Sequence, residues 1–204
     1  MSSSERVVHL VDDDAAIRRS VGFMLKTSSH HVETYESGDQ LLGQSLKLAD
    51  GCILLDVRMP GRDGLEVLQL LHERGVKLPV IIMTGHGDVA LAVKAMKEGA
   101  VDFIEKPFEK TTLLACLNEG FDRLANKETV GDRRKNAEIR LQALTPRERD
   151  VLDGLAKGLP NKTIAYDLGI SPRTVEIHRA NLMTKLSVRS LSEALRIAFA
   201  AQES

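Results

Sequence analysis

The chain has few cysteines and no long apolar run. These two shortages argue against a disulfide-linked protein and against a membrane-spanning one. Only two of its 204 residues are cysteines, and each lies in an apolar pattern. We therefore interpret them as small core residues and not as a disulfide or a metal pair. No segment approaches the ~20 apolar residues of a membrane span, and residues 1–5 lack the apolar core of a signal peptide. We expect a cytoplasmic protein with no membrane contact.

Its length and charge suggest two domains with different partners. A chain of 204 residues that is 43% hydrophobic can bury two cores of ordinary size. Residues 1–125 contain 14 Lys and Arg against 19 Asp and Glu, whereas residues 126–204 contain 14 against 10. The basic second half suggests a polyanionic partner, although so small an excess is also usual for a solvated surface. Charge alone leaves both interpretations open.

The first 125 residues alternate between strand and helix patterns five times. Short apolar runs predict the strands, and segments with apolar residues at helical spacing lie between them. The predicted strands are Val7–Val11, Val32–Tyr35, Ile53–Leu55, Pro79–Met83 and Val101–Glu105, and a helix is expected at Gln40–Leu48. This alternation predicts an α/β fold with a parallel, doubly wound sheet.

Polar residues follow four of the predicted strands. Asp12 and Asp13 follow the first strand, Asp56 the third, Thr84 the fourth and Lys106 the fifth. The carboxyl ends of the strands meet at one edge of such a sheet, where ligands bind, so we expect these side chains to converge. For Asp56 taken alone, a turn aspartate that only caps the next helix is the alternative.

The predicted cluster has the chemistry of a phosphoryl-acceptor site. Three carboxylates in one cleft repel each other unless a cation neutralises them, and a set of oxygen ligands selects Mg²⁺, with Mn²⁺ also suitable. Lys106 supplies a point positive charge and Thr84 a hydroxyl, and both groups suit phosphoryl oxygens. The sequence thus predicts an aspartate that accepts a phosphoryl group.

At these positions the chain resembles the receiver domains of two-component response regulators, over residues 6–122. The motifs that carry the resemblance are Asp12-Asp13, Asp56, Met59-Pro60, Asp63-Gly64, Thr84-Gly85 and Lys106-Pro107. The resemblance implies a five-stranded, flavodoxin-like receiver in which Asp56 takes a phosphoryl group from the phosphohistidine of a sensor histidine kinase. It also implies a cis peptide between Lys106 and Pro107.

The resemblance implies roles for further residues of the receiver. Asp13, Asp56 and the carbonyl of Arg58 would hold Mg²⁺, with Asp12 reaching the ion mostly through water. Phe103 matches the aromatic residue that acts with Thr84 and Lys106 in the switch. The helix at residues 89–98, together with the strand around Phe103, would form a dimer surface after phosphorylation.

A polar stretch separates the two halves. Apolar residues recur at helical spacing up to Leu124, and residues 126–136 are polar and interrupted by Gly131. We predict a partly helical linker over residues 123–141.

The segment 142–204 has the pattern of a small all-α domain. Thr145 and Glu148 form a capping box at the start of one helix. A short second helix begins at Asn161 and ends at Gly169, and Ser171 caps a third. Two short helices joined by so tight a turn predict a helix-turn-helix.

The third helix has one apolar face and one polar face. Val175, Leu182 and Leu186 fall on one side and should pack inward, which leaves the opposite side for the major groove of DNA. The residues on that side are Arg173, Glu176, Ile177, Ala180 and Thr184.

Several of these side chains suit particular contacts with DNA. Glu176 can accept a hydrogen bond from cytosine, Ile177 can touch a thymine methyl group, and Ala180 is small enough for close approach. Arg179 lies on the flank, where a phosphate contact and an ion pair within the domain are equally plausible. His178 points toward the packed side, so a structural role is favoured.

This segment resembles the LuxR/FixJ/NarL-type effector domains. The matching motifs are Leu144-Thr145-Pro146-Arg147-Glu148, Gly158-Leu159-Pro160-Asn161-Lys162 and Ser171-Pro172-Arg173-Thr174-Val175. The resemblance places Asn161, Lys162 and Thr174 at phosphates, where they position the domain without reading sequence. Within the family the FixJ-like subgroup fits best, because of Phe103 and the run Thr174–Asn181.

The two resemblances together imply a response regulator that binds operator DNA as a homodimer once Asp56 is phosphorylated. It would regulate transcription with RNA polymerase, activation being the expected sense. It would not be an enzyme beyond its own Mg²⁺-dependent phosphorylation and aspartyl-phosphate hydrolysis. One alternative is a haloacid-dehalogenase-type enzyme, although such enzymes carry a second Asp where Arg58 stands. Another is a DNA-binding protein whose receiver is only structural.

Overall fold

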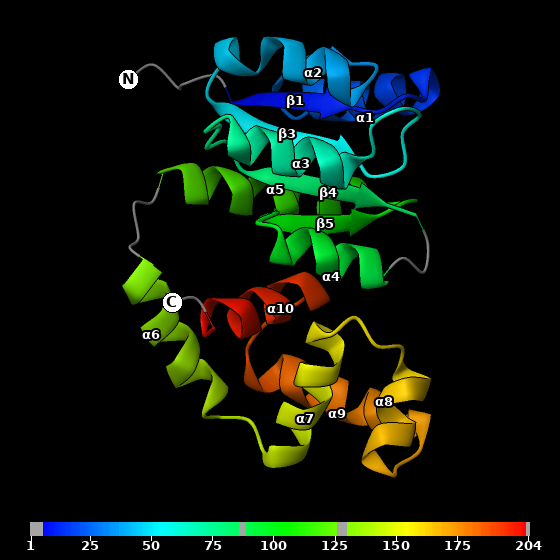
Figure 1. Ribbon diagram of the computed structural model, residues 1–204, viewed down its shortest axis with the longest axis vertical. Helices are drawn as coiled ribbons and strands as arrows, with labels where there is room; N and C mark the ends of the chain where they lie inside the picture. The colour runs from blue at the N-terminus through cyan, green and yellow to red at the C-terminus, as the bar shows by residue number, and fades with distance from the viewer. Residues whose placement is uncertain (1–5, 86–88, 126–129, 203–204) are drawn as a thin grey trace. The chain divides into compact units, whose positions relative to one another are not determined.

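The computed structural model describes residues 6–85, 89–125 and 130–202, and Figure 1 shows its elements along the chain. Residues 126–129, the beginning of the polar stretch in the predicted linker, lie outside the described residues. By its contacts the chain divides into two compact units, residues 1–86 with 98–126 and residues 87–97 with 127–204. Within the described ranges, no helix is both long enough and apolar enough to cross a membrane.

The first unit contains a five-stranded sheet in which every pairing is parallel and the strand order is β2-β1-β3-β4-β5. The strands are β1 Val7–Val11, β2 His31–Tyr35, β3 Gly51–Asp56, β4 Val80–Thr84 and β5 Asp102–Glu105. The order changes direction between β1 and β3, and ligands bind beside such a switch point. The predicted α/β class is confirmed.

Helices lie on both faces of this sheet (Figure 1). Helices α1 (Ala15–Lys26) and α5 (Lys110–Ala125) share a buried core with alternate residues of the strands, among them Leu10 and Leu54. Helices α2 (Gly38–Gln44) and α3 (Gly64–Glu73) pack against each other on the other face. Helix α4 (Val89–Lys97) lies between β4 and β5 in the sequence. Both cysteines are free and buried in the α1–α5 core, as expected.

The prediction for the second helix was wrong in its bounds. A helix was expected at Gln40–Leu48, but α2 ends at Gln44 and the 3-10 turn η1 (Ser45–Lys47) follows. Arg74, at the end of α3, donates a hydrogen bond of 2.6 Å to the carbonyl of Leu42. The same carbonyl accepts from the amide of Ser45, three residues later, in the tighter 3-10 pattern. A contact between distant parts of the chain thus accompanies the end of the helix.

The second unit is helical and contains the predicted helix-turn-helix. Its helices beyond residue 127 are α6 Val130–Leu141, α7 Pro146–Ala156, α8 Asn161–Leu168, α9 Pro172–Lys185 and α10 Leu191–Ala200. Gly169 ends α8 in the left-handed conformation, with φ of 65°. Ser171 caps α9 by accepting from the amide of Thr174. Helix α10 was not anticipated, yet it buries Leu195 and Ile197 in the core of the unit.

The C-terminal end of α9 is closed by a turn that favours glycine but contains serine. The amide of Ser187 donates to the carbonyl of Thr184 and that of Val188 to Met183, both at 3.0 Å. These are the two hydrogen bonds of a Schellman motif, whose left-handed residue is usually glycine. Here that residue is Ser187, with φ of 52°.

We predict that Ser187→Gly stabilises the protein by about 0.5–1 kcal/mol, because relief of the left-handed strain exceeds the entropic cost of glycine. Urea unfolding of the full chain measures the change. Thr184→Gly is the control, since Thr184 lies inside α9 and glycine there should lower the midpoint. A lowered midpoint for both variants would contradict the account of this turn.

Candidate functional site

Three carboxylates gather at the carboxyl edge of the sheet, where the sequence predicted them. Ligand atoms of Asp12, Asp13 and Asp56 all lie within 4.8 Å of one another. Asp12 follows β1 and Asp56 ends β3, and these strands are neighbours at the switch point. The side chains of Asp12 and Asp56 are buried, and Asp13 is exposed. The site is therefore open to solvent on the side of Asp13.

Lys106 reaches into this cluster from the end of β5. Its Nζ donates to Asp12 Oδ2 at 2.7 Å and to Asp56 Oδ1 at 2.8 Å. Its backbone amide bonds the carbonyl of Thr84 at 2.8 Å, which fixes the chain beside β4. The peptide bond between Lys106 and Pro107 is cis, as the resemblance implied. Four of the five predicted side chains thus meet at one point.

Negative charge exceeds positive charge in this cluster. Three carboxylates face one ammonium group, so two negative charges remain. Burial raises the pKa of Asp56, and although Lys106 opposes that shift, the charges of Asp12 and Asp13 raise the pKa further. Burial tends to lower the pKa of Lys106, but its hydrogen bonds to Asp12 and Asp56 leave that pKa above its ordinary value. The raised pKa of Asp56 thus follows first from burial, and the raised pKa of Lys106 follows from its two carboxylate partners.

The cluster fits a hard divalent cation. Its donor atoms are all oxygens, and two uncompensated charges match those of Mg²⁺ or Mn²⁺. Asp12, Asp13 and Asp56 are placed to hold such an ion. Arg58 lies two residues beyond Asp56 in the turn after β3, and its side chain is exposed.

Thr84 and Phe103, the two other residues predicted to act in the switch, do not take part in the cluster. The Thr84 side chain is fully buried at the end of β4, and its hydroxyl donates to the carbonyl of Ile104 in β5 at 3.5 Å. Phe103 is half-buried on β5, opposite Ile82 in the strand register. Within the described residues, neither side chain forms a hydrogen bond with the carboxylates of the cluster. Their predicted roles in the switch remain predictions.

Gly64 lets the loop after β3 lie close to Asp56. The sequence pattern did not reveal why glycine is required there. A Cβ atom at Gly64 would lie 2.4 Å from the carbonyl oxygen of Asp56, so only glycine fits there. Asp63 then caps α3 in a capping box with Glu66. The Asp63-Gly64 pair therefore fixes the start of α3 against the end of β3.

In the helical unit, α9 presents the face that the sequence predicted. Val175, Leu182 and Leu186 are buried. The opposite face is exposed and contains Arg173, Glu176, Ile177, Ala180 and Thr184. Ile177 is 50% exposed, so its side chain is accessible on this face.

Some of the side chains predicted to bind DNA bind each other in this structure. Arg173 pairs with Glu176 at 2.8 Å, and Arg179 donates to the side-chain oxygen of Asn161 at 3.4 Å. The partner of Arg179 is thus an amide on α8, which links the two helices of the motif. The Thr174 hydroxyl lies 2.8 Å from that of Ser171. A DNA contact through these groups would exchange hydrogen bonds that already exist.

Lys162 lies on the exposed part of the first turn of α8 and is available for a phosphate, whereas His178 is half-buried on α9.

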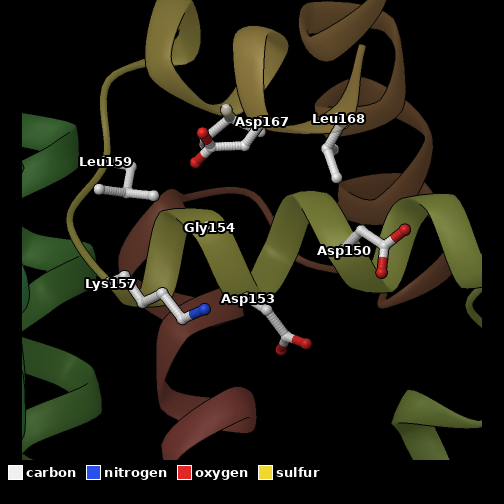
Figure 2. Close-up of a pocket in the computed structure, with 8 residues that line it drawn as sticks. Asp150, Asp153, Gly154, Lys157, Leu159, Asp167 and Leu168 are labelled. Carbon is white, nitrogen blue, oxygen red and sulfur yellow. The ribbon is translucent and has the colours of Figure 1, made fainter. Parts of the chain in front are cut away.

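A pocket between α7 and α8 shows which side of the unit is unsuited to DNA. It has a volume of about 200 Å³. Figure 2 shows Asp150 and Asp153 on α7 and Asp167 on α8 around it, with Lys157 the one cation among the lining residues. Three carboxylates repel a phosphate backbone. This surface of the unit is therefore unsuited to contact with a polyanion.

Each of the two parts of the chain matches a known protein family. Residues 8–118 match the response regulator receiver domain, and residues 142–198 match the luxR family of bacterial regulatory proteins. The transcriptional regulatory protein FixJ of Azorhizobium caulinodans is 50% identical over 95% of this chain and 92% of its own length. FixJ of Rhizobium meliloti is 44% identical over 97% of each chain.

Solved structures give the same result. Full-length FixJ from B. japonicum has 42% sequence identity and a TM-score of 0.60, with 98% of each chain covered. The response regulator StyR has 36% identity and a TM-score of 0.57, with 96% of this chain and 99% of its own covered. The resemblance drawn from the sequence is confirmed. The chain belongs to the response regulators, as a FixJ-like member with a receiver domain and a LuxR-type DNA-binding domain.

Proposed function

We propose that this protein is a transcription factor switched by phosphorylation of Asp56. The observation that carries the proposal is the cluster in which Lys106 bonds both Asp12 and Asp56 while Asp13 lies beside them. A sensor histidine kinase would supply the phosphoryl group. A carboxylate oxygen of Asp56 attacks phosphorus, the phosphorus–nitrogen bond of the phosphohistidine breaks, and its electron pair stays on the imidazole nitrogen.

The residues around Asp56 have separate tasks in this reaction. Lys106, already 2.8 Å from Asp56, is placed to donate to a phosphoryl oxygen once the new bond forms. Asp13, Asp56 and the carbonyl of Arg58 would hold Mg²⁺, with Asp12 mostly through water, and the ion when bound neutralises charge on the phosphoryl oxygens. Hydrolysis of the aspartyl phosphate would reset the protein. This chemistry acts on the chain itself and on no separate substrate.

The phosphoryl group would change the receiver through Thr84 and Phe103. It adds about 1.5 to 2 negative charges, which attract the Thr84 hydroxyl and Lys106. Thr84 then exchanges its 3.5 Å bond to Ile104 for a stronger, charge-assisted one. Phe103 turns into the space that Thr84 leaves. A shift of the receiver from a 1:99 to a 99:1 ratio of active to inactive conformation requires about 5.5 kcal/mol. Two charge-assisted hydrogen bonds at about 1.5–3 kcal/mol each nearly supply this free energy.

We propose that the switched receiver forms a homodimer through α4 and the strand around Phe103. One helix-turn-helix contacts little DNA, whereas a dimer reads two half-sites about one helical turn apart. The bound dimer would act with RNA polymerase in the cytoplasm and activate transcription. On each half-site the exposed face of α9 would read bases. The phosphate contacts would come from Asn161, Lys162, Thr174 and Arg179.

Two other functions are less well supported. A haloacid-dehalogenase-type enzyme needs a second Asp two residues after the acceptor, and Arg58 stands there. The relatives described above are named as transcriptional regulators. A receiver with only a structural role has no need of a partly exposed lysine held between two buried carboxylates.

Acetyl phosphate with Mg²⁺ should phosphorylate the full chain at Asp56. The expected adduct is one phosphoryl group by intact mass, stable in acid and labile in base, and absent from Asp56→Asn. Asp63→Asn is the matched control, because Asp63 lies in the same loop and its cap survives the change. Labelling of Asp56→Asn equal to that of the wild type would refute the acceptor assignment.

Asp13→Asn should abolish Mg²⁺-dependent phosphorylation and weaken Mn²⁺ binding at least tenfold, as measured by electron paramagnetic resonance. Without metal, the variant should be as stable as the wild type or more stable by up to about 1 kcal/mol, since a repelling charge is removed. Asp50→Asn is the control, because Asp50 precedes β3 at the opposite edge of the sheet. Unchanged metal binding in Asp13→Asn would remove Asp13 from the metal site.

Thr84→Ala should still accept the phosphoryl group but should shift its dimer and DNA-binding equilibria at least tenfold less, because one charge-assisted hydrogen bond is missing. Thr84→Ser keeps the hydroxyl and should restore most of the response. Operator binding and sedimentation in beryllofluoride, a phosphoryl mimic, measure both effects. A full response from Thr84→Ala would show that the switch does not pass through this hydroxyl.

A further inference from the structure

Helix α9 is attached to its domain by little apolar surface. Of its 14 residues, Val175 and Leu182 are the buried ones. A helix that reads bases must be held to within about 0.5 Å, because hydrogen bonds to base edges fail with small displacements. Leu186, at the C-terminal end of α9, is buried as well, and polar contacts at that end add to the orientation that this packing gives.

One such contact joins the last turn of α9 to the start of α7. The Nζ of Lys185 donates to Glu148 Oε2 at 2.7 Å, and Glu148 is only 3% exposed. The hydrogen bond from Lys185, followed by one from the backbone of Thr145, lowers the pKa of Glu148 to about 2. Glu148 is therefore ionised at neutral pH, and its bond with Lys185 ties the two helices together.

A second contact comes from α6, in the segment between the two matched domains. The Schellman turn satisfies the carbonyls of Met183 and Thr184, and the carbonyl of Leu186 accepts from the guanidinium of Arg140. A cation is favourable at this position, because the C-terminal carbonyls of a helix carry partial negative charge.

Helix α6 is itself anchored in the unit. Ala137 is 4% exposed and Leu141 3% exposed, and α6 packs against α10. Arg140 lies between these two anchors in sequence and is therefore fixed relative to the domain. Its hydrogen bond to Leu186 transmits that position to the end of α9.

We propose that Arg140 is a positioning residue for base recognition, and that α6 belongs to the DNA-reading unit although it lies outside residues 142–198. The inference rests on the proposed reading of DNA by α9. Without Arg140 the C-terminal end of α9 keeps its ion pair through Lys185 and the packing of Leu182 and Leu186, but its last carbonyl loses a partner and that end gains freedom to tilt. Base contacts on α9 then weaken. The phosphate contact of Lys162 on α8 does not depend on that end of α9, so binding without sequence preference persists.

The test compares specific with non-specific binding by the full-length protein in beryllofluoride and Mg²⁺. A library of random DNA duplexes is first selected with the wild type, and dissociation constants are then measured for the enriched duplex and its scrambled version. Arg140→Ala should lower the ratio of the two constants about tenfold, the effect of one lost hydrogen bond to a charged group. Arg140→Lys keeps a donor and should recover most of the ratio. Arg149→Ala removes an exposed arginine of α7 and should leave the ratio unchanged.

The ratio separates positioning from simple destabilisation, because an inactive fraction weakens binding to both duplexes equally. An unchanged ratio in Arg140→Ala would overturn the inference, and so would an equal fall in Arg149→Ala, which would make the effect one of net charge. If the wild type enriches no sequence, the proposed reading of DNA fails before the Arg140 variants are compared.

Discussion

The receiver depends on the repulsion between carboxylates at the end of β1 and the end of β3. A parallel sheet brings Asp12 and Asp56 together there, and Asp13 lies beside them. Lys106 compensates one of the three charges and leaves two. A cation and then a phosphoryl group are the chemical partners that such a site favours. The repulsion between these like charges lowers the stability of the fold. A cation or a phosphoryl group that binds there changes the electrostatic energy of the site, which is the physical basis of the proposed switch.

The helical unit is under a different constraint. Helix α9, which is proposed to read DNA, must be exposed on one face and still be held accurately. Helix α9 buries few residues, and polar contacts compensate for the small apolar contact. Asn161 bonds the flank of the helix, Glu148 bonds its last turn, and Arg140 bonds its terminal carbonyl. These contacts come from α8, α7 and α6 in turn. The orientation of the reading helix is thus a property of the whole unit, including a helix that the sequence assigned to the linker.

Features that depend on local pattern or on the topology of the sheet could be predicted from the sequence, and those that depend on single contacts between distant residues could not. The strand Val7–Val11 and the capping box at Thr145 follow from neighbouring residues. The carboxylate cluster follows from topology, because parallel strands end at one edge. The end of α2 is accompanied by a contact from Arg74, which lies 32 residues from its carbonyl partner. The contact of Arg140 with Leu186 spans 46 residues. No periodicity in the sequence predicts such pairs. The roles of the switch residues also depend on contacts between distant residues, and they remain predictions.

We propose that charge added at Asp56 drives the formation of a dimer. Sedimentation of the full-length protein in Mg²⁺, with and without beryllofluoride and over a range of concentrations, measures this step. We expect a monomer without the phosphoryl mimic and a dimer with it, and the dimer should form over the same concentrations at which operator binding rises. A protein that stays monomeric in both conditions while DNA binding rises would rule this mechanism out, because the switch would then act without a second copy of the chain.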